Sequence, residues 1–397
     1  MTDHRSEYDV GGVLLERPFK IDRLGHLGLY LEDLPGAQTF FGDVLGFRCT
    51  DVLGPAPGFP ANRGYFYTHC TDHHSLALIG ADVARSRDDR YARGITVNQL
   101  SFQVGTLDEM VHAYRLLKDR GRSIWRVGRD RPGSNYAVYF QDPDGHTVEL
   151  FYGMEQIGWD GRSKPMDVFA HLGRTTEPEL PQAAELDEVL AAQAKGADLG
   201  SGHRAKDMPD GTYVVGGIKL PRPFRIVRTG PIDLFVEDMD AAVRFYAETL
   251  GLRVSETTQC DGERCVFLRA GGEHHTIGLI PLSLRTGLSL STHTTVASIG
   301  IQVGSYRQLL DAVSFLHARG CSEVDLPASL HPGIDYAAHF VGPEGHLVRL
   351  YYDMERIGWD GKPRPAELRP SVRRPWPDVL SGVSDPYAQR CFMGPLG

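Results

Sequence analysis

GGVLLERPFKIDRLGH at residues 11–26 and GGIKLPRPFRIVRTGP at residues 216–231 are the stretches that decide the fold. A second pair of matching stretches lies further along the chain, with ELFYGMEQIGWD at 149–160 and RLYYDMERIGWD at 349–360. Both pairs are separated by about 200 residues, and a repeated offset of this kind indicates an internal duplication. We therefore predict two homologous halves of similar size.

Each half divides again into two modules with the same order of secondary-structure elements. Residues 26–47 read as an alternating apolar strand, an acidic turn and a helix-period segment that ends at Gly46. Asp33 is suited to cap that helix, with Pro35 in its first turn. Residues 99–121 repeat the pattern, and Gly121 ends the helix.

Short alternating runs bounded by turn residues follow the helices, as expected for antiparallel strands. In the first half they are 65–70, 75–80, 136–141 and 146–152. The sequence thus predicts an α+β fold made of four βαβββ modules, at about 21–83, 95–155, 224–284 and 295–355.

The domain organisation that we predict has four parts. They are an N-terminal two-module domain at 1–160, a linker with a surface helix at 161–222, a C-terminal two-module domain at 223–360 and a Pro-rich tail at 361–397.

The composition bears on whether the partner is a nucleic acid, a membrane or a small molecule. The chain has 397 residues and a net charge of −9 with mixed signs, and it lacks the basic run that a nucleic-acid-binding protein carries. The polar N-terminus is unlike a signal peptide, and no apolar run approaches the ~20 residues of a membrane span.

The cysteines are scattered without a C-x-x-C pair, which argues against a disulfide framework and a thiolate zinc site. They are Cys49, Cys70, Cys260, Cys265, Cys321 and Cys391. We expect a soluble cytoplasmic protein with a small-molecule partner.

The strand, helix and three strands, repeated in pairs, resemble the vicinal oxygen chelate superfamily over about three quarters of the chain. This superfamily includes glyoxalase I, methylmalonyl-CoA epimerase, bleomycin-resistance proteins and type I extradiol ring-cleavage dioxygenases. The resemblance implies that each pair of modules forms an incomplete barrel around a divalent metal. Its ligands come from the first strand of each module and the last strand of the second.

Two local patterns point to the extradiol branch. VYFQDPDGHTVEL at 138–150 is similar to the extradiol signature, and YTHCTDHHSLALIG at 67–80 resembles the strand that carries the active-site histidine pair. Four modules on one chain is also the usual number in that branch.

The resemblance implies a metal triad of His26, Gln99 and Glu149. Strand alternation turns Glu149 away from its apolar neighbours, and a carboxylate inside a barrel would need a compensating cation. Gln99 stands where extradiol dioxygenases have a second histidine, so it is either a weaker oxygen ligand or a residue that lines the pocket.

The resemblance also implies catalytic roles for His74 and Tyr139. His74 matches an acid–base histidine, although the doublet recurs at 274–275 and is alternatively a scaffold feature. Tyr139 matches a tyrosine that hydrogen-bonds the substrate oxygen, with plain packing as the alternative. A further family histidine is absent, and Asp130 and Arg131 occupy its place.

The second half lacks these ligands. Pro231, Ser298 and Arg349 stand at the positions of His26, Gln99 and Glu149. Proline cannot coordinate a metal and arginine carries the wrong charge. We therefore interpret His331, His339 and His346 as surface or packing residues, and this half as a structural or oligomerising partner.

The leading functional hypothesis is a dioxygenase that cleaves a catechol-like aromatic with O₂, using Fe(II) or alternatively Mn(II). The alternative is a non-oxidative isomerase, epimerase or lyase, in which the metal stabilises an enediolate. A small-molecule binding protein is a third hypothesis. A homo-oligomer is the expected assembly, with no nucleic-acid or membrane partner.

Overall fold

The structure is a computed structural model that describes residues 8–129, 133–182, 184–206, 209–358, 360–370 and 372–380. Two eight-stranded mixed sheets dominate it, and two short hairpins precede them in the chain. The hairpins are β1 (Tyr8–Val10) with β2 (Val13–Leu15), and β11 (Tyr213–Val215) with β12 (Ile218–Leu220).

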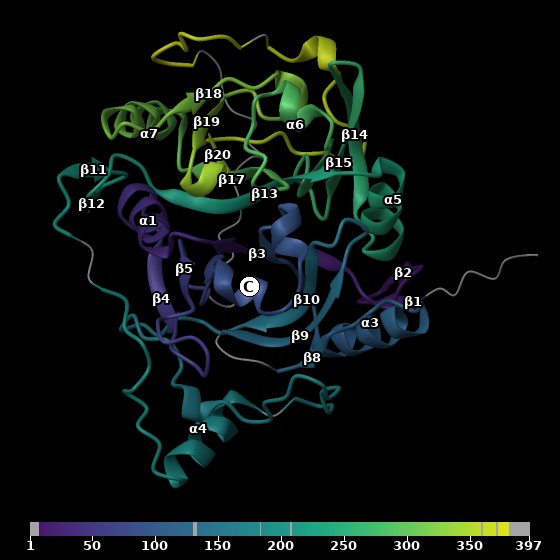
Figure 1. The fold of residues 1–397 in the computed structure, drawn as a ribbon, viewed down its shortest axis with the longest axis vertical. Helices are drawn as coiled ribbons and strands as arrows, with labels where there is room; N and C mark the ends of the chain where they lie inside the picture. The colour runs from purple at the N-terminus through teal and green to yellow at the C-terminus, as the bar shows by residue number, and fades with distance from the viewer. Residues whose placement is uncertain are drawn as a thin grey trace, which may run out of the picture. The chain divides into compact units, whose positions relative to one another are not determined.

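The first sheet has the strand order β4-β5-β6-β3-β7-β10-β9-β8. Its strands β8, β9 and β10 lie beside one another in Figure 1. The first strands of the two modules, β3 and β7, lie side by side at its centre in antiparallel pairing. The strands are β3 (Ile21–Leu31), β4 (Arg48–Leu53), β5 (Gly64–Thr68), β6 (Leu76–Gly80), β7 (Val97–Val104), β8 (Arg126–Gly128), β9 (Ser134–Gln141) and β10 (Thr147–Met154).

The second sheet repeats this order strand for strand, as β14-β15-β16-β13-β17-β20-β19-β18. Its strands are β13 (Ile226–Val236), β14 (Arg253–Cys260), β15 (Glu263–Arg269), β16 (Ile277–Pro281), β17 (Val296–Val303), β18 (Glu323–Val324), β19 (Ala337–Val341) and β20 (Leu347–Tyr351). The α+β class and the four-module repeat predicted from the sequence are therefore confirmed.

A helix follows the first strand of each module, and shorter helices lie in the connections. In module 1, α1 (Leu34–Gln38) continues into the π-helix η1 (Thr39–Leu45). Asp33 accepts a hydrogen bond from the Gly36 backbone N–H, as a helix N-cap does, and Gly46 ends the segment with φ of 99°. The other helices of at least four residues are α2 (Ala81–Arg85), η2 (Arg90–Arg93), α3 (Leu107–Asp119), α4 (Glu185–Ala194), α5 (Met239–Arg244), η4 (Phe245–Thr249), α6 (Leu284–Gly287) and α7 (Tyr306–Ala318).

The described residues also form short 3₁₀ helices of three residues each. They are η3 (Met166–Val168), η5 (Ala328–Leu330), η6 (Pro343–Gly345) and η7 (Ala366–Leu368). Thr106 caps α3 and Ser305 caps α7, each with a side-chain oxygen that accepts from a backbone N–H three residues ahead.

The residue contacts define two compact units. One contains residues up to 29, 49–79 and 97–205, and the other contains 30–48, 80–96 and the chain from 206 onward. Neither unit is a continuous stretch, so the four domain boundaries drawn from the sequence stay a prediction.

The linker contains α4, whose Glu188 is buried against Arg129. Lys164 donates to the same carboxylate at 2.9 Å, and Arg129 also contacts Glu155 at 3.2 Å. A buried charge is tolerated when it is paired and hydrogen-bonded, and this network supplies both. It attaches the linker helix to the end of β8 within the first unit.

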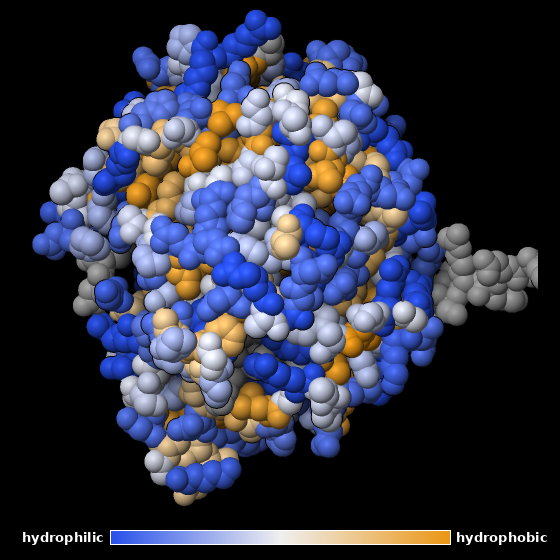
Figure 2. All heavy atoms as spheres, viewed as in Figure 1, coloured by the Kyte–Doolittle hydropathy of each residue, from blue (hydrophilic) through white to orange (hydrophobic). Residues whose placement is uncertain are grey.

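Apolar side chains of the strands fill the core, while hydrophilic side chains cover most of the surface that Figure 2 displays, around smaller apolar areas. Across the described part of the chain, none of the helices has the length and apolar character that crossing a bilayer requires. The described cysteines form no disulfide. Cys391 and the last seventeen residues of the predicted tail, 381–397, lie outside the described residues.

Candidate metal centre

One row of residues crosses four neighbouring strands of the first sheet. Strand pairing sets His26 of β3 opposite Ser101 of β7, Ser101 opposite Glu149 of β10, and Glu149 opposite Tyr139 of β9. Residues that are paired across a sheet point to the same face. The register therefore gathers an imidazole, two hydroxyls and a carboxylate on one buried face.

His26 and Glu149 converge as two ligands of one cation do. His26 Nε2 lies 2.9 Å from Glu149 Oε2, and both side chains are fully buried. The contact lacks hydrogen-bond geometry, and among the described residues neither ring nitrogen of His26 has a hydrogen-bond partner. Two ligand atoms that sit about 2.1 Å from a metal, at right angles, are about 3.0 Å apart. The observed spacing fits a shared divalent ion.

The surroundings of Glu149 keep it ionised. Tyr139 Oη donates to Glu149 Oε1 at 2.6 Å, and Ser101 Oγ donates to Oε2. Burial acts to raise the pKa of Glu149, but His26 and the two hydroxyl donors outweigh it and hold the pKa below its ordinary value. An ionised carboxylate is the form that coordinates a metal.

His74 stands beside this pair. Its ring centroid lies 4.2 Å from that of His26, and Phe66 packs at 5.0 Å. Burial, followed by the charges of His26 and His73, lowers the pKa of His74 well below its ordinary value, so the ring is neutral. Its Nε2 has no hydrogen-bond partner among the described residues.

A short chain of hydrogen bonds runs from His74 toward the protein surface. His74 Nδ1 is 3.0 Å from His73 Nδ1, and His73 Nε2 is 3.2 Å from the partly exposed Asp51. Ser163 Oγ also donates to Asp51 at 3.2 Å. These contacts fix the orientation of the His74 ring from its far side.

The model of the Glyoxalase/Bleomycin resistance protein/Dioxygenase superfamily matches residues 23–150 and 226–350, which together make up more than half of the chain. The protein belongs to this superfamily. The two matched segments correspond to the two eight-stranded sheets.

The curated relatives of this superfamily member include aromatic-ring dioxygenases. It is 27% identical over 137 residues to the 2,2',3-trihydroxybiphenyl dioxygenase of Sphingomonas paucimobilis, covering 34% of this chain and 42% of the relative. It is 31% identical over 132 residues to biphenyl-2,3-diol 1,2-dioxygenase 2 of Rhodococcus globerulus, covering 33% and 64%. The chain thus spans about two fifths of the first relative and under two thirds of the second.

Solved structures share the superfamily fold. The 2,3-dioxygenase LapB from Pseudomonas sp. KL28 aligns with a TM-score of 0.56 at 14% identity, over 87% of this chain and 96% of the other. The Mn(II)-bound glyoxalase from Novosphingobium aromaticivorans aligns with a TM-score of 0.52 at 14% identity, over 86% and 85%. A divalent metal is therefore present in a structural neighbour.

Gln99 lies two residues before Ser101 on β7. It pairs with Gly28, on the same face as Ser101, and its side chain packs over that glycine. Among the described residues we find no hydrogen bond made by its amide. Ser101 is the residue of β7 that touches Glu149 directly, and the sequence analysis overlooked it because no family motif marks it. Gln99 as a ligand stays a prediction.

Tyr139 is the second residue for which the resemblance implied a catalytic role. Tyr139 donates a hydrogen bond to Glu149. Its contact with a substrate oxygen, which the resemblance implies, stays a prediction. Its ring also packs under Arg126, with the guanidinium carbon 4.2 Å from the ring centroid. Asp130 and Arg131 lie outside the described residues.

The second half has a buried salt bridge at the positions that correspond to the candidate metal centre. Arg349 aligns with Glu149 in the strand register and donates to Asp233 at 2.6 Å, with both side chains fully buried. Ser298 also donates to Asp233 at 2.7 Å, and Arg349 Nε donates to His339 at 2.9 Å. A covalently held guanidinium thus supplies positive charge to a site where the first half would bind a cation.

The histidine doublet recurs in the second half with a different anchor. His274 Nε2 contacts Glu256 at 2.8 Å, and Arg369 binds the same carboxylate. Burial acts to raise the pKa of Glu256, but His274 and Arg369 lower it to about 2. The contact within the doublet is thus the same in both halves, at 3.0 Å, and in the first half His74 also lies beside His26.

One further group of potential ligands lies in the β9–β10 turn. Within the described residues, Asp142, Asp144 and His146 bring one ligand atom each within 4.8 Å of the others. Asp142 accepts from the Asp144 and His146 backbone N–H groups and contacts His146 Nδ1 at 2.8 Å. These bonds explain the group as a stabilised turn that orients β10.

Proposed function

We propose that this protein is a metal-dependent ring-cleaving dioxygenase of the extradiol type, acting on a catechol-like aromatic with O₂. The observation that carries the proposal is the convergence of His26 Nε2 and Glu149 Oε2 at 2.9 Å on a buried face, with the neutral His74 ring beside them. The similarity to biphenyl-diol and trihydroxybiphenyl dioxygenases supports the same reaction class.

The metal would be held by His26 and Glu149, with Gln99 as the proposed third ligand. Imidazole and carboxylate suit first-row divalent metals, so we propose Fe(II), with Mn(II) as the alternative. When bound, the metal supplies an electrophilic centre and a template for two vicinal oxygens.

His74 would serve as the base toward a substrate hydroxyl. Because Asp51 accepts from His73 Nε2, His73 Nδ1 is left to accept from the N–H at His74 Nδ1. The lone pair of His74 then resides on Nε2, the atom without a partner among the described residues. A neutral imidazole with this tautomer removes a proton from a phenol within hydrogen-bond reach.

Tyr139 and Ser101 would hold the Glu149 carboxylate in one orientation. Each hydroxyl donates to a different oxygen of Glu149, so the carboxylate cannot rotate without breaking a bond. Residues that hydrogen-bond to a metal ligand commonly tune the affinity for the metal. Phe151, whose ring centroid lies 5.0 Å from that of His26, excludes water from one side of the pair.

One observation favours a second candidate function. His26 is the only imidazole among the described residues within ion-pair distance of Glu149, whereas iron oxygenases usually have two histidines and a carboxylate. A metal held by one histidine, an amide oxygen and a carboxylate suits a non-oxidative isomerase, epimerase or lyase equally well.

The test combines metal analysis with oxygen consumption. Purified protein loaded with Fe(II) is supplied with a panel of catechols that includes 2,3-dihydroxybiphenyl, and O₂ uptake and ring-cleaved product are followed. We expect Glu149→Ala to lose both metal and activity. Gln99→Ala is compared with Ser298→Ala, the matching change in the second half, and only the former should weaken metal binding.

Two results would count against the proposal. If the metal-loaded protein takes up no O₂ with any catechol, the oxidative reaction is wrong and the non-oxidative alternative takes its place. If Glu149→Ala retains the metal at full stoichiometry, the metal centre itself lies elsewhere.

A further inference from the structure

The linker helix α4 has an unusual distribution of polar and apolar side chains. Glu185 and Glu188 face the first unit, where both contact Lys164, and Glu188 is buried. Leu186 and Leu190 face the solvent instead, with 65% and 53% of their surface exposed. A helix on the surface of a protein normally turns its apolar residues toward the core. The outer side of α4 is therefore apolar, although it is the side in contact with water.

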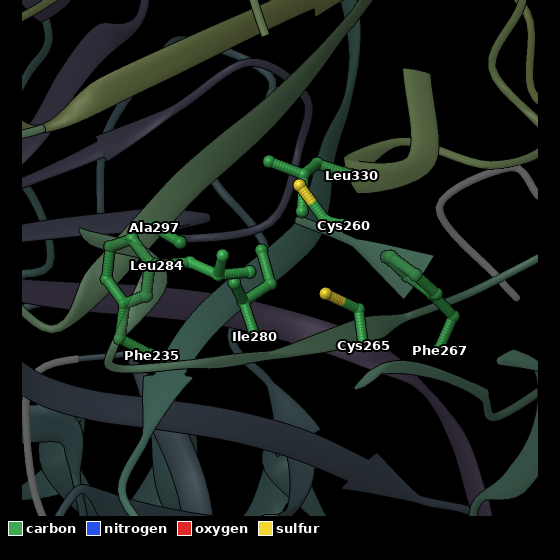
Figure 3. Packing of buried hydrophobic residues seen from close by; sticks show 8 residues of the cluster. All are labelled: Phe235, Cys260, Cys265, Phe267, Ile280, Leu284, Ala297 and Leu330. Atoms are coloured by element: carbon green, nitrogen blue, oxygen red, sulfur yellow. The ribbon is translucent and has the colours of Figure 1, made fainter. Parts of the chain in front are cut away.

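The core of the second sheet has the usual arrangement, which makes the contrast clear. Figure 3 displays the large apolar side chains Phe235, Ile280 and Leu284 packed together away from water. In α4, side chains of the same kind lie outside, and the helix cannot turn over without separating the buried pair of Arg129 and Glu188. A contiguous apolar surface that is held in the solvent marks a contact site.

The apolar residues of α4 form a ridge that is complementary to itself. Leu186, Leu190 and the exposed Ala194 are four residues apart, so they follow one line along the outer side of the helix. Leu190 lies in the middle, and the other two are each about 6 Å from it along the helix axis. When two copies of α4 cross antiparallel at Leu190, the large Leu186 of one copy faces the small Ala194 of the other. This is the self-matching that a two-fold symmetric contact requires.

The exposed charges of α4 favour the same antiparallel orientation. Asp187 lies near the N-terminal end and Lys195 is the C-terminal cap. Both are exposed, and neither forms an ion pair within the described part of the chain. An antiparallel contact brings Asp187 of each copy toward Lys195 of the other and opposes the two helix dipoles favourably. A parallel contact would instead bring like charges together.

We propose that α4 is a self-association surface, through which two copies of the chain form a dimer with Leu190 on the two-fold axis. A helix of ten residues is about 15 Å long, so the contact is smaller than the ~800 Å² per partner of a standard stable complex. The dimer is therefore weak and depends on concentration. It is independent of the proposed dioxygenase function, because α4 contains none of the residues of the candidate metal centre.

The test measures the mass of the full-length protein in solution by sedimentation velocity, over a wide range of concentration. We expect the dimer fraction to rise with concentration. Leu190→Lys places two like charges on the axis and should weaken the dimer about tenfold or more. Val214→Lys is the matched control, because Val214 of β11 is 74% exposed but lies outside α4, and this variant should dimerise like the wild type.

Two further sets of variants test the orientation. Lys195→Glu should weaken the dimer, and the addition of Asp187→Lys should restore it, because the exchanged charges again face each other. Leu190→Cys should form a disulfide-linked dimer under mild oxidation, since the two Leu190 positions meet on the axis. Leu186→Cys should not, because the two Leu186 positions are separated by about 12 Å along the axis.

Four results would overturn the proposal. They are a protein that stays monomeric at every concentration, a dimer that Leu190→Lys leaves unchanged, a charge exchange that fails to restore association, and equal cross-linking of the two cysteine variants. Binding of the wild type to phosphatidylcholine vesicles that is lost in Leu190→Lys would make α4 a membrane contact, and it would also refute the assignment.

Discussion

Replacing Tyr139 by phenylalanine removes the hydroxyl that donates to Glu149 Oε1 at 2.6 Å, and it changes little else in the buried row. A bond of this length to a carboxylate is in the strong, charge-assisted range. Such bonds contribute about 1.5–3 kcal/mol. Because Glu149 must be ionised and correctly oriented to bind a cation, we expect the affinity for Mn(II) or Fe(II) to fall about ten- to hundredfold.

The measurement is a titration of metal-free protein with Mn(II), followed by calorimetry, for wild type and Tyr139→Phe. Tyr152→Phe on the neighbouring strand is the control, since Tyr152 is only half-buried, and it should change the affinity less than about twofold. Equal affinity of Tyr139→Phe and wild type would refute the reasoning. A raised KM for a catechol with unchanged metal affinity would instead indicate that the hydroxyl contacts the substrate.

Two further predictions concern stability, and both are measured by urea unfolding. Glu188→Ala leaves the fully buried Arg129 guanidinium short of its main partner and should cost about 3 kcal/mol. Glu185→Ala on the same helix removes a mostly exposed contact to Lys164 and should cost under about 1 kcal/mol, so equal losses would contradict the burial argument. Burial lowers the pKa of His346 to about 4, so the unfolded chain binds a proton first as the pH falls through about 6.5. His346 should therefore contribute up to about 3 kcal/mol to the decline of stability between pH 6.5 and 4, in addition to the other buried histidines whose pKa is lowered. His346→Gln should make that decline smaller, and a pH profile parallel to that of the wild type would refute the assignment.

The repeats in the sequence were sufficient to predict the module order, because each module carries its own strand period, cap and glycine stop. Asp33 and Gly46 show how local these signals are, since each acts within a few residues of its own position. Because the two halves are duplicates, the strand order of the second sheet is the same as that of the first.

The site was only partly predictable, because its geometry depends on strand register. The β3–β7 ladder has irregularities on both sides of His26, between Leu24 and His26 and between Gly28 and Leu29. Counting residues along two strands cannot reveal such shifts, so Ser101 was not recognised as the residue opposite both His26 and Glu149.

The salt bridge of the second half likewise could not be predicted from the sequence. Arg349 was recognised as a lost ligand, but its partner Asp233 aligns with Gly28, a position that carries no family motif. Only the folded chain brings the two charges together, over 116 residues of separation.

The guanidinium of Arg349 has a consequence for the two halves of the duplication. A positive charge that is built into the chain cannot dissociate, be chelated or be exchanged for a different ion. The second sheet therefore assembles its interior without help from the surroundings. The charge inside that sheet is therefore permanent, because it is part of the polypeptide itself.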